Sequence, residues 1–207
     1  QARALYEQSL LIRQRLNDKP RIAALLNNLG ILARYKGDVA QARALYEESL
    51  RLRRELGDKL MVAHSLNNLG NLVLDAGEYD QARALLEEAV SIRREVGDRW
   101  AAANSLNNLG NVVRAQGDYD QARALYRESL SINRELGDKW AIAYLLEDVG
   151  GLAVLEGQYD RALRLSGAAA ALRESIGAPL SAVDSAKLDR LLEPARQAIK
   201  PETRQSL

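Results

Sequence analysis

The sequence predicts an all-α solenoid of stacked antiparallel helix pairs, and two periodicities support this prediction. The segment QARAL begins at residues 1, 41, 81 and 121, and residues 41–80 are identical to residues 81–120 at 24 of 40 positions. Within this 40-residue period, a glycine followed by a polar residue recurs every 20 residues. A short repeating unit cannot bury its apolar side chains alone, so successive units must stack on one another.

The glycine–polar pairs predict where one helix ends and the next begins. Glycine or asparagine can adopt the left-handed conformation that ends a helix, and a following aspartate can accept hydrogen bonds from the N–H groups that start one. The predicted helices are about 16–18 residues long, or roughly 25 Å at about 1.5 Å per residue. The pairs are Asn17-Asp18, Gly37-Asp38, Gly57-Asp58, Gly77-Glu78, Gly97-Asp98, Gly117-Asp118, Gly137-Asp138 and Gly157-Gln158, with Gly177 in the same position downstream.

The residues between these corners have a helical pattern. In residues 81–96, apolar side chains recur at three- and four-residue intervals, which is typical of an amphipathic helix. They are Ala82, Leu85, Leu86, Ala89, Val90, Ile92 and Val96. We interpret the opposite face as a solvated outer face; it contains Arg83, Glu87, Glu88, Arg93, Arg94 and Glu95.

Composition narrows the classes of function. Lysine plus arginine (29) nearly balances aspartate plus glutamate (28), so no strong field favours nucleic acid or an acidic membrane surface. No apolar run approaches the ~18 residues of a membrane span, no signal peptide opens the chain, and we expect a cytoplasmic protein. The chain has no cysteine and a single histidine, so we expect no metal site and no cofactor. Phosphate-binding and nucleophile motifs are missing from the sequence, so we expect no enzymatic activity.

The repeated motif resembles a known family. LNNLG, followed by G-(D/E)-Y whose glycine is seven positions after that of LNNLG, and then by A-x-x-x-(Y/L)-x-x-(S/A), resembles the tetratricopeptide repeat. The resemblance covers residues 1 to about 176, although the first helix lacks the early Trp and the second lacks the final Pro. The period of 40 exceeds the usual ~34 residues, and this longer form is similar to the repeats of kinesin light chain and of bacterial signalling ATPases and transcriptional regulators. In the unit 63–96 the signature positions are Leu69, Gly70, Gly77, Tyr79, Ala82 and Ala89.

These features divide the chain into a repeat array over residues 1–178 and a C-terminal capping helix and tail over residues 179–207. The array would contain half a repeat at 1–18 and units that begin near residues 19, 59, 99 and 139. We expect the small residues of 166–171 to let the capping helix approach closely. We expect Pro194 to kink or break that helix, because its ring clashes with the carbonyl four residues earlier.

The resemblance implies a right-handed superhelix whose concave groove is lined by the first helix of each unit. It also implies a scaffold that binds a peptide or a partner protein in that groove, here as a segment of a larger bacterial signalling protein. The alternative is a structural spacer or oligomerisation module without a groove ligand, and RNA binding is disfavoured by charge and by the few aromatic residues. The candidate peptide-binding residues are Asn27, Arg34, His64, Asn67, Asn71, Asn104, Asn107, Asn111 and Arg114.

The repeated asparagines have two interpretations. Asparagine is a poor helix former, so its recurrence in NNLG indicates a role. In the structural interpretation the amides bond backbone carbonyls and tie adjacent units together, and we assign it to Asn28, Asn68 and Asn108. In the functional interpretation the amides offer a donor and an acceptor to the backbone of an extended peptide. We assign it to Asn67, Asn71, Asn107 and Asn111.

Other residues are open to two interpretations as well. Arg34 and Arg114 occupy equivalent positions and would favour a peptide with acidic character. His64 is interpreted as a polar contact rather than a metal ligand. Trp100 and Trp140, each in the first turn of its helix, either pack beneath the corner or stay exposed as anchors for a partner.

The first helix presents an apolar strip that includes Leu5, Tyr6 and Leu10. Solenoid ends generally need a polar outer face for solubility. We therefore expect possible end-to-end self-association through this helix.

Overall fold

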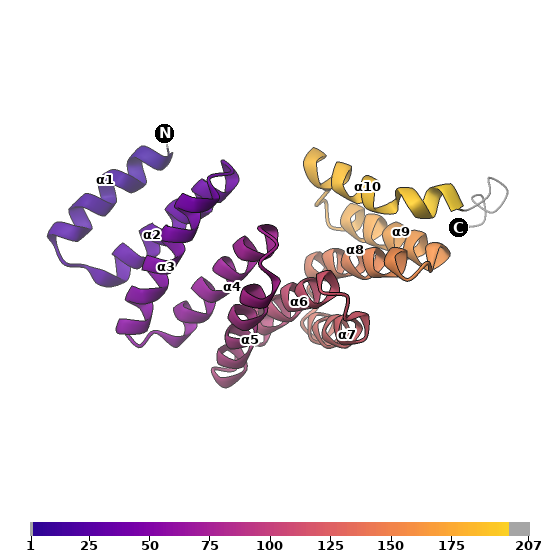
Figure 1. Cartoon of the computed structure of the whole chain (residues 1–207), viewed down its shortest axis with the longest axis horizontal. Helices are drawn as coiled ribbons and strands as arrows, with labels where there is room; N and C mark the ends of the chain where they lie inside the picture. Colours follow the sequence, from indigo (N-terminus) through magenta and orange to yellow (C-terminus); the bar gives the residue numbers. More distant parts are fainter. Residues whose placement is uncertain (1, 199–207) are drawn as a thin grey trace. The chain divides into compact units, whose positions relative to one another are not determined.

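The computed structural model describes residues 2–198, which form helices joined by short corners (Figure 1). Gln1 and residues 199–207, which contain the predicted tail, lie outside the described residues. Between residues 2 and 198 the structure has ten helices and no strand, and the all-α prediction is confirmed. The helices are α1 (Ala2–Arg15), α2 (Lys19–Tyr35), α3 (Val39–Glu55), α4 (Lys59–Asp75), α5 (Tyr79–Glu95), α6 (Arg99–Ala115), α7 (Tyr119–Leu136), α8 (Lys139–Leu155), α9 (Tyr159–Ser175) and α10 (Ala182–Ala198).

The corners lie where the glycine–polar pairs predict them. The corner glycines have φ angles between 63° and 87°, and Asn17 has a φ of 51°. Six of the aspartates that follow accept a hydrogen bond from the backbone N–H three residues on, as Asp58 does from Met61 at 3.1 Å. Glu78 and Gln158 make no such bond, because their side chains are one methylene longer.

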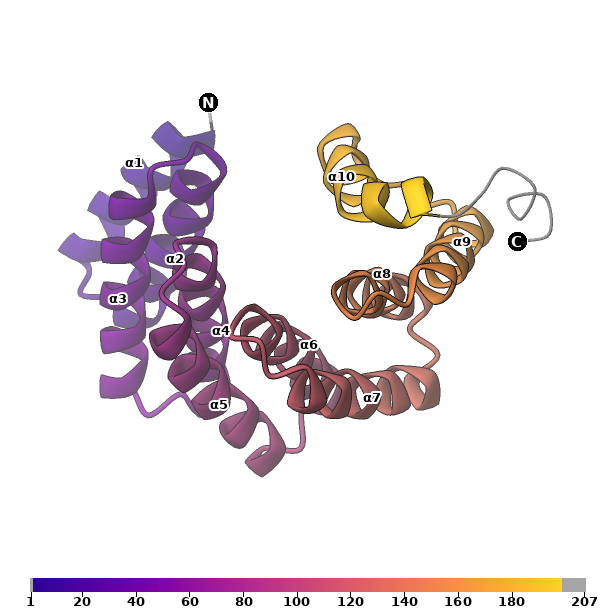
Figure 2. The same cartoon turned by 45° about the vertical axis from the view of Figure 1, so that its right-hand side comes forward.

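The helices form two compact units, Gln1–Val112 and Val113–Leu207, which we call unit 1 and unit 2. In unit 1, α2 packs on α3 and α4 packs on α5; in unit 2, α8 packs on α9 (Figure 2). Gly70 allows the close approach predicted for it, since a Cβ atom there would lie 2.8 Å from Cγ of the buried Leu86. Tyr46 takes the place of Leu86 opposite Gly30 in the preceding pair.

Helix α1 packs on α2 in unit 1, where Leu10 contacts a core cluster of Ala23, Leu26 and Leu52. Much of its apolar surface is nevertheless open, and Leu5 is 66% exposed. End-to-end association through this helix stays a prediction. Sedimentation of the chain over a concentration series, beside a Leu5→Glu, Tyr6→Glu variant, would test it.

Helix α10 packs on α8 and α9 in unit 2. Its residues Leu192 and Ala195 are buried in a cluster with Ala153 and Ala162. The helix continues past Pro194 to Ala198, so the predicted break is wrong. Leu192 and Ala195, on the two sides of the proline, hold the chain against α8 and α9, and the described residues include one turn of helix after it.

The approach of α10 to α9 is less close than we expected from the small residues of 166–171. Ala169 is buried, but Ala168, Ala170 and Ala171 are exposed. No helix among the described residues has the length and apolar content needed to cross a membrane.

Candidate functional site: the first-helix face of unit 1

The candidate site lies on α2, α4 and the part of α6 within unit 1, which are the first helices of their pairs. We call their shared polar surface the first-helix face; its half-buried members are His64, Asn68, Asn71, Asn104, Asn107, Asn108 and Asn111. Two other candidate residues are buried: Asn27 is 3% exposed and Asn67 is 8% exposed. Arg34 is exposed on α2, whereas Arg114 belongs to unit 2.

The asparagines connect the successive first helices. Asn68 Nδ2 donates to Asn27 Oδ1 at 2.9 Å, and Asn108 Nδ2 donates to Asn67 Oδ1 at 3.1 Å. The second asparagine of each pair thus bonds the first asparagine of the preceding unit, and the acceptor is a side-chain amide rather than the backbone carbonyl we expected. We call Asn27, Asn67, Asn68 and Asn108 the asparagine ladder. Direct contact of Asn27 or Asn67 with a ligand stays a prediction.

Helices α3 and α5 of unit 1 each contain a buried arginine, and Arg93 on α5 bonds the ladder directly. Arg93 is 6% exposed, so its placement on a solvated face was wrong. Its Nη1 donates to the Ala101 carbonyl at 2.7 Å and to Asn67 Oδ1 at 3.5 Å. Ser105 Oγ also donates to Asn67 Oδ1, at 2.9 Å. Asn67 is therefore the shared acceptor for groups from α5 and α6.

Arg53 repeats this arrangement one period earlier. It is 5% exposed, and its Nη1 donates to the Met61 carbonyl at 3.0 Å and to Ser65 Oγ at 2.7 Å. Burial lowers the pKa of both guanidinium groups, although Asp58 and Asp98 at longer range oppose this effect. Among the described residues, the hydrogen-bond acceptors of Arg53 and Arg93 are uncharged oxygens or the His64 ring. Each is a buried cation without a bonded anion.

His64 lies next to Arg53 on the first-helix face. Its Nδ1 is 3.4 Å from Arg53 Nη1. Burial lowers the pKa of His64, and the charges of Arg53 and Arg93 lower it further. The imidazole is therefore uncharged at neutral pH. Asn71 lies two turns along α4, and Asn104 is the equivalent of His64 on α6, where it accepts a hydrogen bond from Asn108 at 3.4 Å.

The arginines that we expected to favour an acidic ligand are already engaged. Arg34 pairs with Asp75, at 2.5 Å from Nη2 and 3.1 Å from Nε to the same carboxylate oxygen. In unit 2, Arg114 Nη1 donates to the Asp148 carbonyl at 3.0 Å and lies 3.9 Å from its carboxylate. An attraction for acidic groups on the first-helix face therefore has to come from Arg53 and Arg93.

At the repeat positions equivalent to Asn67 and Arg93, unit 2 has an ion pair. Glu147 stands where unit 1 has Asn67, and it accepts two hydrogen bonds from the buried Arg173 at 2.7 and 2.9 Å. The Arg173 guanidinium lies 4.1 Å above the Tyr144 ring, whose centroid is 4.4 Å from that of Trp140. Trp140 is 47% exposed, which favours the exposed alternative over packing beneath the corner. Trp100 in unit 1 is 54% exposed and gives the same result.

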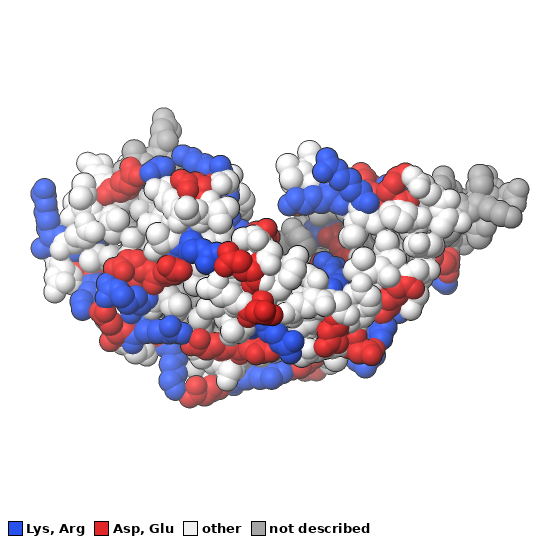
Figure 3. All heavy atoms as spheres, viewed as in Figure 1, with Lys and Arg blue, Asp and Glu red and all other residues white. Residues whose placement is uncertain are grey.

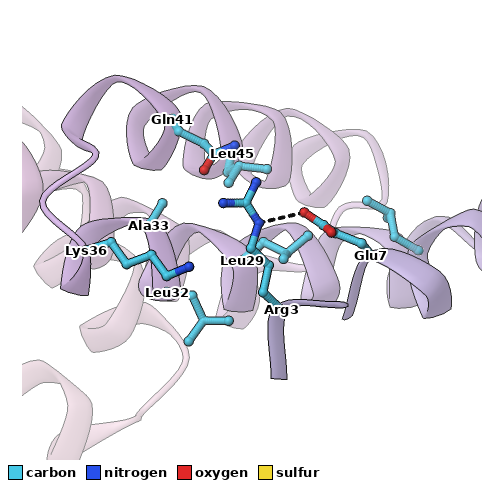
Figure 4. Close-up of a pocket in the computed structure, with 9 residues that line it drawn as sticks. Arg3, Glu7, Leu29, Leu32, Ala33, Lys36, Gln41 and Leu45 are labelled. Atoms are coloured by element: carbon cyan, nitrogen blue, oxygen red, sulfur yellow. Dashed lines mark hydrogen bonds and ion pairs between the residues drawn. The ribbon is translucent and has the colours of Figure 1, made fainter. Parts of the chain in front are cut away.

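The rest of unit 1 offers a mixed-charge surface and a small cleft. Acidic and basic side chains are intermixed over the side of the molecule in Figure 3. A small cleft of about 190 Å³ lies between α1, α2 and α3, where Arg3 and Glu7 form an ion pair of 2.7 Å above Leu29, Leu32 and Leu45 (Figure 4). Within residues 2–198, no group of three or more His, Asp or Glu side chains is placed to hold a metal ion.

The ordered helix pairs and their glycine corners define a helical repeat protein. The chain belongs to the tetratricopeptide repeat family, whose model matches residues 1–55, 21–95 and 101–175. Repeats of this family generally act as non-catalytic scaffolds, and the fold is that of a protein–protein interaction scaffold. The sequence matches no curated protein.

Solved structures share the fold at low identity. BtubC (BKLC) from P. vanneervenii superposes with a TM-score of 0.77 at 22% identity, over 95% of this chain and 82% of that chain. A Rap protein complexed with Competence and Sporulation Factor gives 0.73 at 16% identity, over 84% of this chain and 49% of that chain. A putative kinesin light chain from Podospora anserina gives 0.68 at 19% identity, over 86% and 88%. At these identities the likeness concerns the fold alone.

Proposed function

We propose that the first-helix face of unit 1 binds an extended, acidic segment of a partner protein. The observation that supports this proposal is the pair of buried guanidinium groups, Arg53 and Arg93, that lack a bonded anion. Burying a charge without a counter-charge is costly. A ligand carboxylate near His64 would therefore gain from the field of both arginines, while the asparagine ladder keeps the surrounding side chains fixed.

The half-buried side chains of the same face supply the polar contacts. Asn71 and Asn104 can each offer a donor and an acceptor to a ligand backbone. An extended segment needs such paired groups at regular intervals, because its own N–H and C=O groups lose water on binding. The 40-residue repeat provides that regularity.

The complex between the Rap protein and Competence and Sporulation Factor gives further support by analogy. We propose that this chain likewise holds a ligand, as a cytoplasmic segment of a larger bacterial signalling protein. The second candidate function is a structural spacer or oligomerisation module, which the exposed apolar surface of α1 favours.

Defined peptides test the proposal. Acidic, neutral and basic peptides of one length and one apolar content would be titrated into the full chain by calorimetry. The acidic peptide should bind most tightly, and an Asn71→Ala, Asn104→Ala variant should weaken it, because each lost hydrogen bond costs about 0.5–1.5 kcal/mol. Glu47→Ala, Ser91→Ala on the exposed side of α3 and α5 is the matched control.

Equal affinity for acidic and basic peptides would remove the role proposed for Arg53 and Arg93. Binding that survives the α4 and α6 changes but is lost in the control would place the ligand elsewhere. If none of the peptides binds and the chain associates with itself through α1, the spacer function replaces this one.

A further inference from the structure

Unit 2 contains a cleft that the first-helix face does not explain. It has a volume of about 430 Å³ and lies between α9, the loop after it, and α10, with one residue from α8. Its walls include Glu147, Ala170, Arg173, Glu174, Leu180 and Leu188. Ligand pockets commonly measure about 300–1,000 Å³ and are mostly apolar with a few fixed polar groups, so this cleft has both the size and the character of a binding site.

The cleft exists because α10 covers only part of α9. The C-terminal half of α10 is anchored by Leu192 and Ala195, whereas Val183 near its start is 65% exposed. On the α9 side the lining includes the small residues Ser166 and Ala170, and Ala170 is exposed. Small side chains opposite a helix end that is held away leave apolar surface uncovered.

The charged side chains of the cleft include a fixed ion pair and one further glutamate. Arg173 is 4% exposed, and both oxygens of Glu147 accept hydrogen bonds from it, so this pair has no net charge. Tyr144 covers the guanidinium at 4.1 Å. Glu174 is exposed at the rim. Glu147, Arg173 and Glu174 are the charged residues of the lining, so the cleft has a net charge of −1 and Arg173 is not available to attract an anion.

We propose that this cleft binds an apolar side chain that stands next to a lysine or arginine in a segment of a partner protein. The apolar side chain fills the space over Ala170, between Leu180 and Leu188. The neighbouring basic group pairs with Glu174. The site is independent of the one on unit 1 and selects the opposite charge.

The chain provides its own reporter for this site. Trp140 contacts Tyr144, and Tyr144 lies against Arg173 in the cleft wall. In a Trp100→Phe background, Trp140 is the single tryptophan, because the sequence has two. Three peptides of equal length would be titrated against its fluorescence: one with leucine beside lysine, one with leucine beside glutamate, and one with serine beside lysine.

We expect only the leucine–lysine peptide to bind with a measurable Kd. Ala170→Phe, which fills the cleft without adding a tryptophan, should weaken it at least tenfold, and Glu174→Gln should weaken it about threefold or more through loss of the charge pair. Ala171→Phe, at an exposed α9 position outside the cleft lining, is the matched control and should bind like the parent. Circular dichroism would check that each variant keeps its helices.

Three results would overturn the proposal. The Ala170→Phe and Ala171→Phe variants could bind equally well, the glutamate peptide could bind as tightly as the lysine peptide, or Ala170→Phe could abolish a dimer seen by sedimentation, which would assign the cleft to a second copy. The Asn71→Ala, Asn104→Ala variant should leave this binding unchanged, so failure here is distinguishable from failure of the site on unit 1.

Discussion

Units 1 and 2 each have a buried arginine at the same repeat position, but among the described residues only the arginine of unit 2 is paired with a carboxylate. Arg93 in unit 1 is surrounded by uncharged oxygens from Asn67, Ala101 and Ser105. Arg173 in unit 2, two periods later, has the carboxylate of Glu147 as its partner. Glutamate in place of asparagine thus neutralises the buried arginine of unit 2. In unit 1 the charge of the buried arginine has no bonded anion within residues 2–198 and lies beneath a polar face.

The largest loss of stability should come from removing the buried ion pair between Glu147 and Arg173 in unit 2. Glu147→Ala leaves Arg173 as a buried cation without its anion, and breaking a buried ion pair in this way costs about 3–5 kcal/mol. The free energy of unfolding would be measured by urea denaturation. A matched control is Glu48→Ala, which removes an exposed partner of Arg51 and should cost no more than about 0.5 kcal/mol. Similar losses for the two variants would contradict the distinction between the units.

A smaller loss should follow from the equivalent change in unit 1. Asn67→Ala removes an uncharged acceptor shared by Arg93, Ser105 and Asn108, so we expect about 1–3 kcal/mol of destabilisation. Asn71→Ala, one turn along α4 and half-buried, should cost about 0.5 kcal/mol or less. Thermal unfolding of the two variants would compare these losses of stability. A larger loss in Asn71→Ala than in Asn67→Ala would show that the hydrogen bonds of Asn67 do not stabilise unit 1.

Glycines at the helix crossings give a third comparison. A Cβ atom at Gly70 would meet the stem of the fully buried Leu86 at 2.8 Å, whereas one at Gly151 would meet the ends of Leu191 and Arg114 at 2.8 and 2.9 Å. Overpacking typically costs about 1–3 kcal/mol. Because side-chain ends can move aside, Gly70→Ala should approach the upper part of this range and Gly151→Ala the lower. Urea denaturation that finds Gly151→Ala the more damaging would show that α10 is held more rigidly than its half-exposed residues suggest.

Much of this fold could be predicted because its signals are local. The positions of Gly57 and Asp58 determine a corner by backbone conformation and capping alone, and the structure has it there. The burial of Arg93 could not be predicted from its charge, because its acceptors come from α4 and α6. A signal was nevertheless present: Arg93 continues the buried series of Ala82, Leu86 and Ala89 at a four-residue step.

Two further differences have the same non-local origin. Pro194 was expected from backbone geometry to kink or break its helix, but the helix is not broken, because burial of Leu192 and Ala195 against other helices outweighs that cost. The pairing of Arg34 with Asp75 joins residues 41 positions apart. Asn28, Asn68 and Asn108 were predicted to tie adjacent units together through backbone carbonyls, but the atoms that Asn68 and Asn108 bond depend on how α2, α4 and α6 align.

The stability of unit 1 should depend weakly on pH through His64. Its pKa in the folded chain is lowered from the ordinary value of 6.5. Between 6.5 and that lower value, the unfolded chain binds more protons than the folded chain, so stability should fall as the pH falls through this window and level off below it. His64→Gln should remove the dependence. If urea denaturation of the variant shows the same pH dependence of stability as the parent chain, this dependence comes from groups other than His64.

The pKa of His64 tests most directly the claim that Arg53 and Arg93, which lack a bonded anion, leave a positive field on the first-helix face of unit 1. It can be measured by NMR without overlap, because the chain has one histidine. We predict a pKa of His64 below 6.5 in the parent chain and a higher pKa in Arg93→Met, where a like charge is removed. Arg94→Met, at the exposed neighbouring position, should leave it unchanged. A parent value at or above 6.5, or the same value in Arg93→Met as in the parent, would contradict the account.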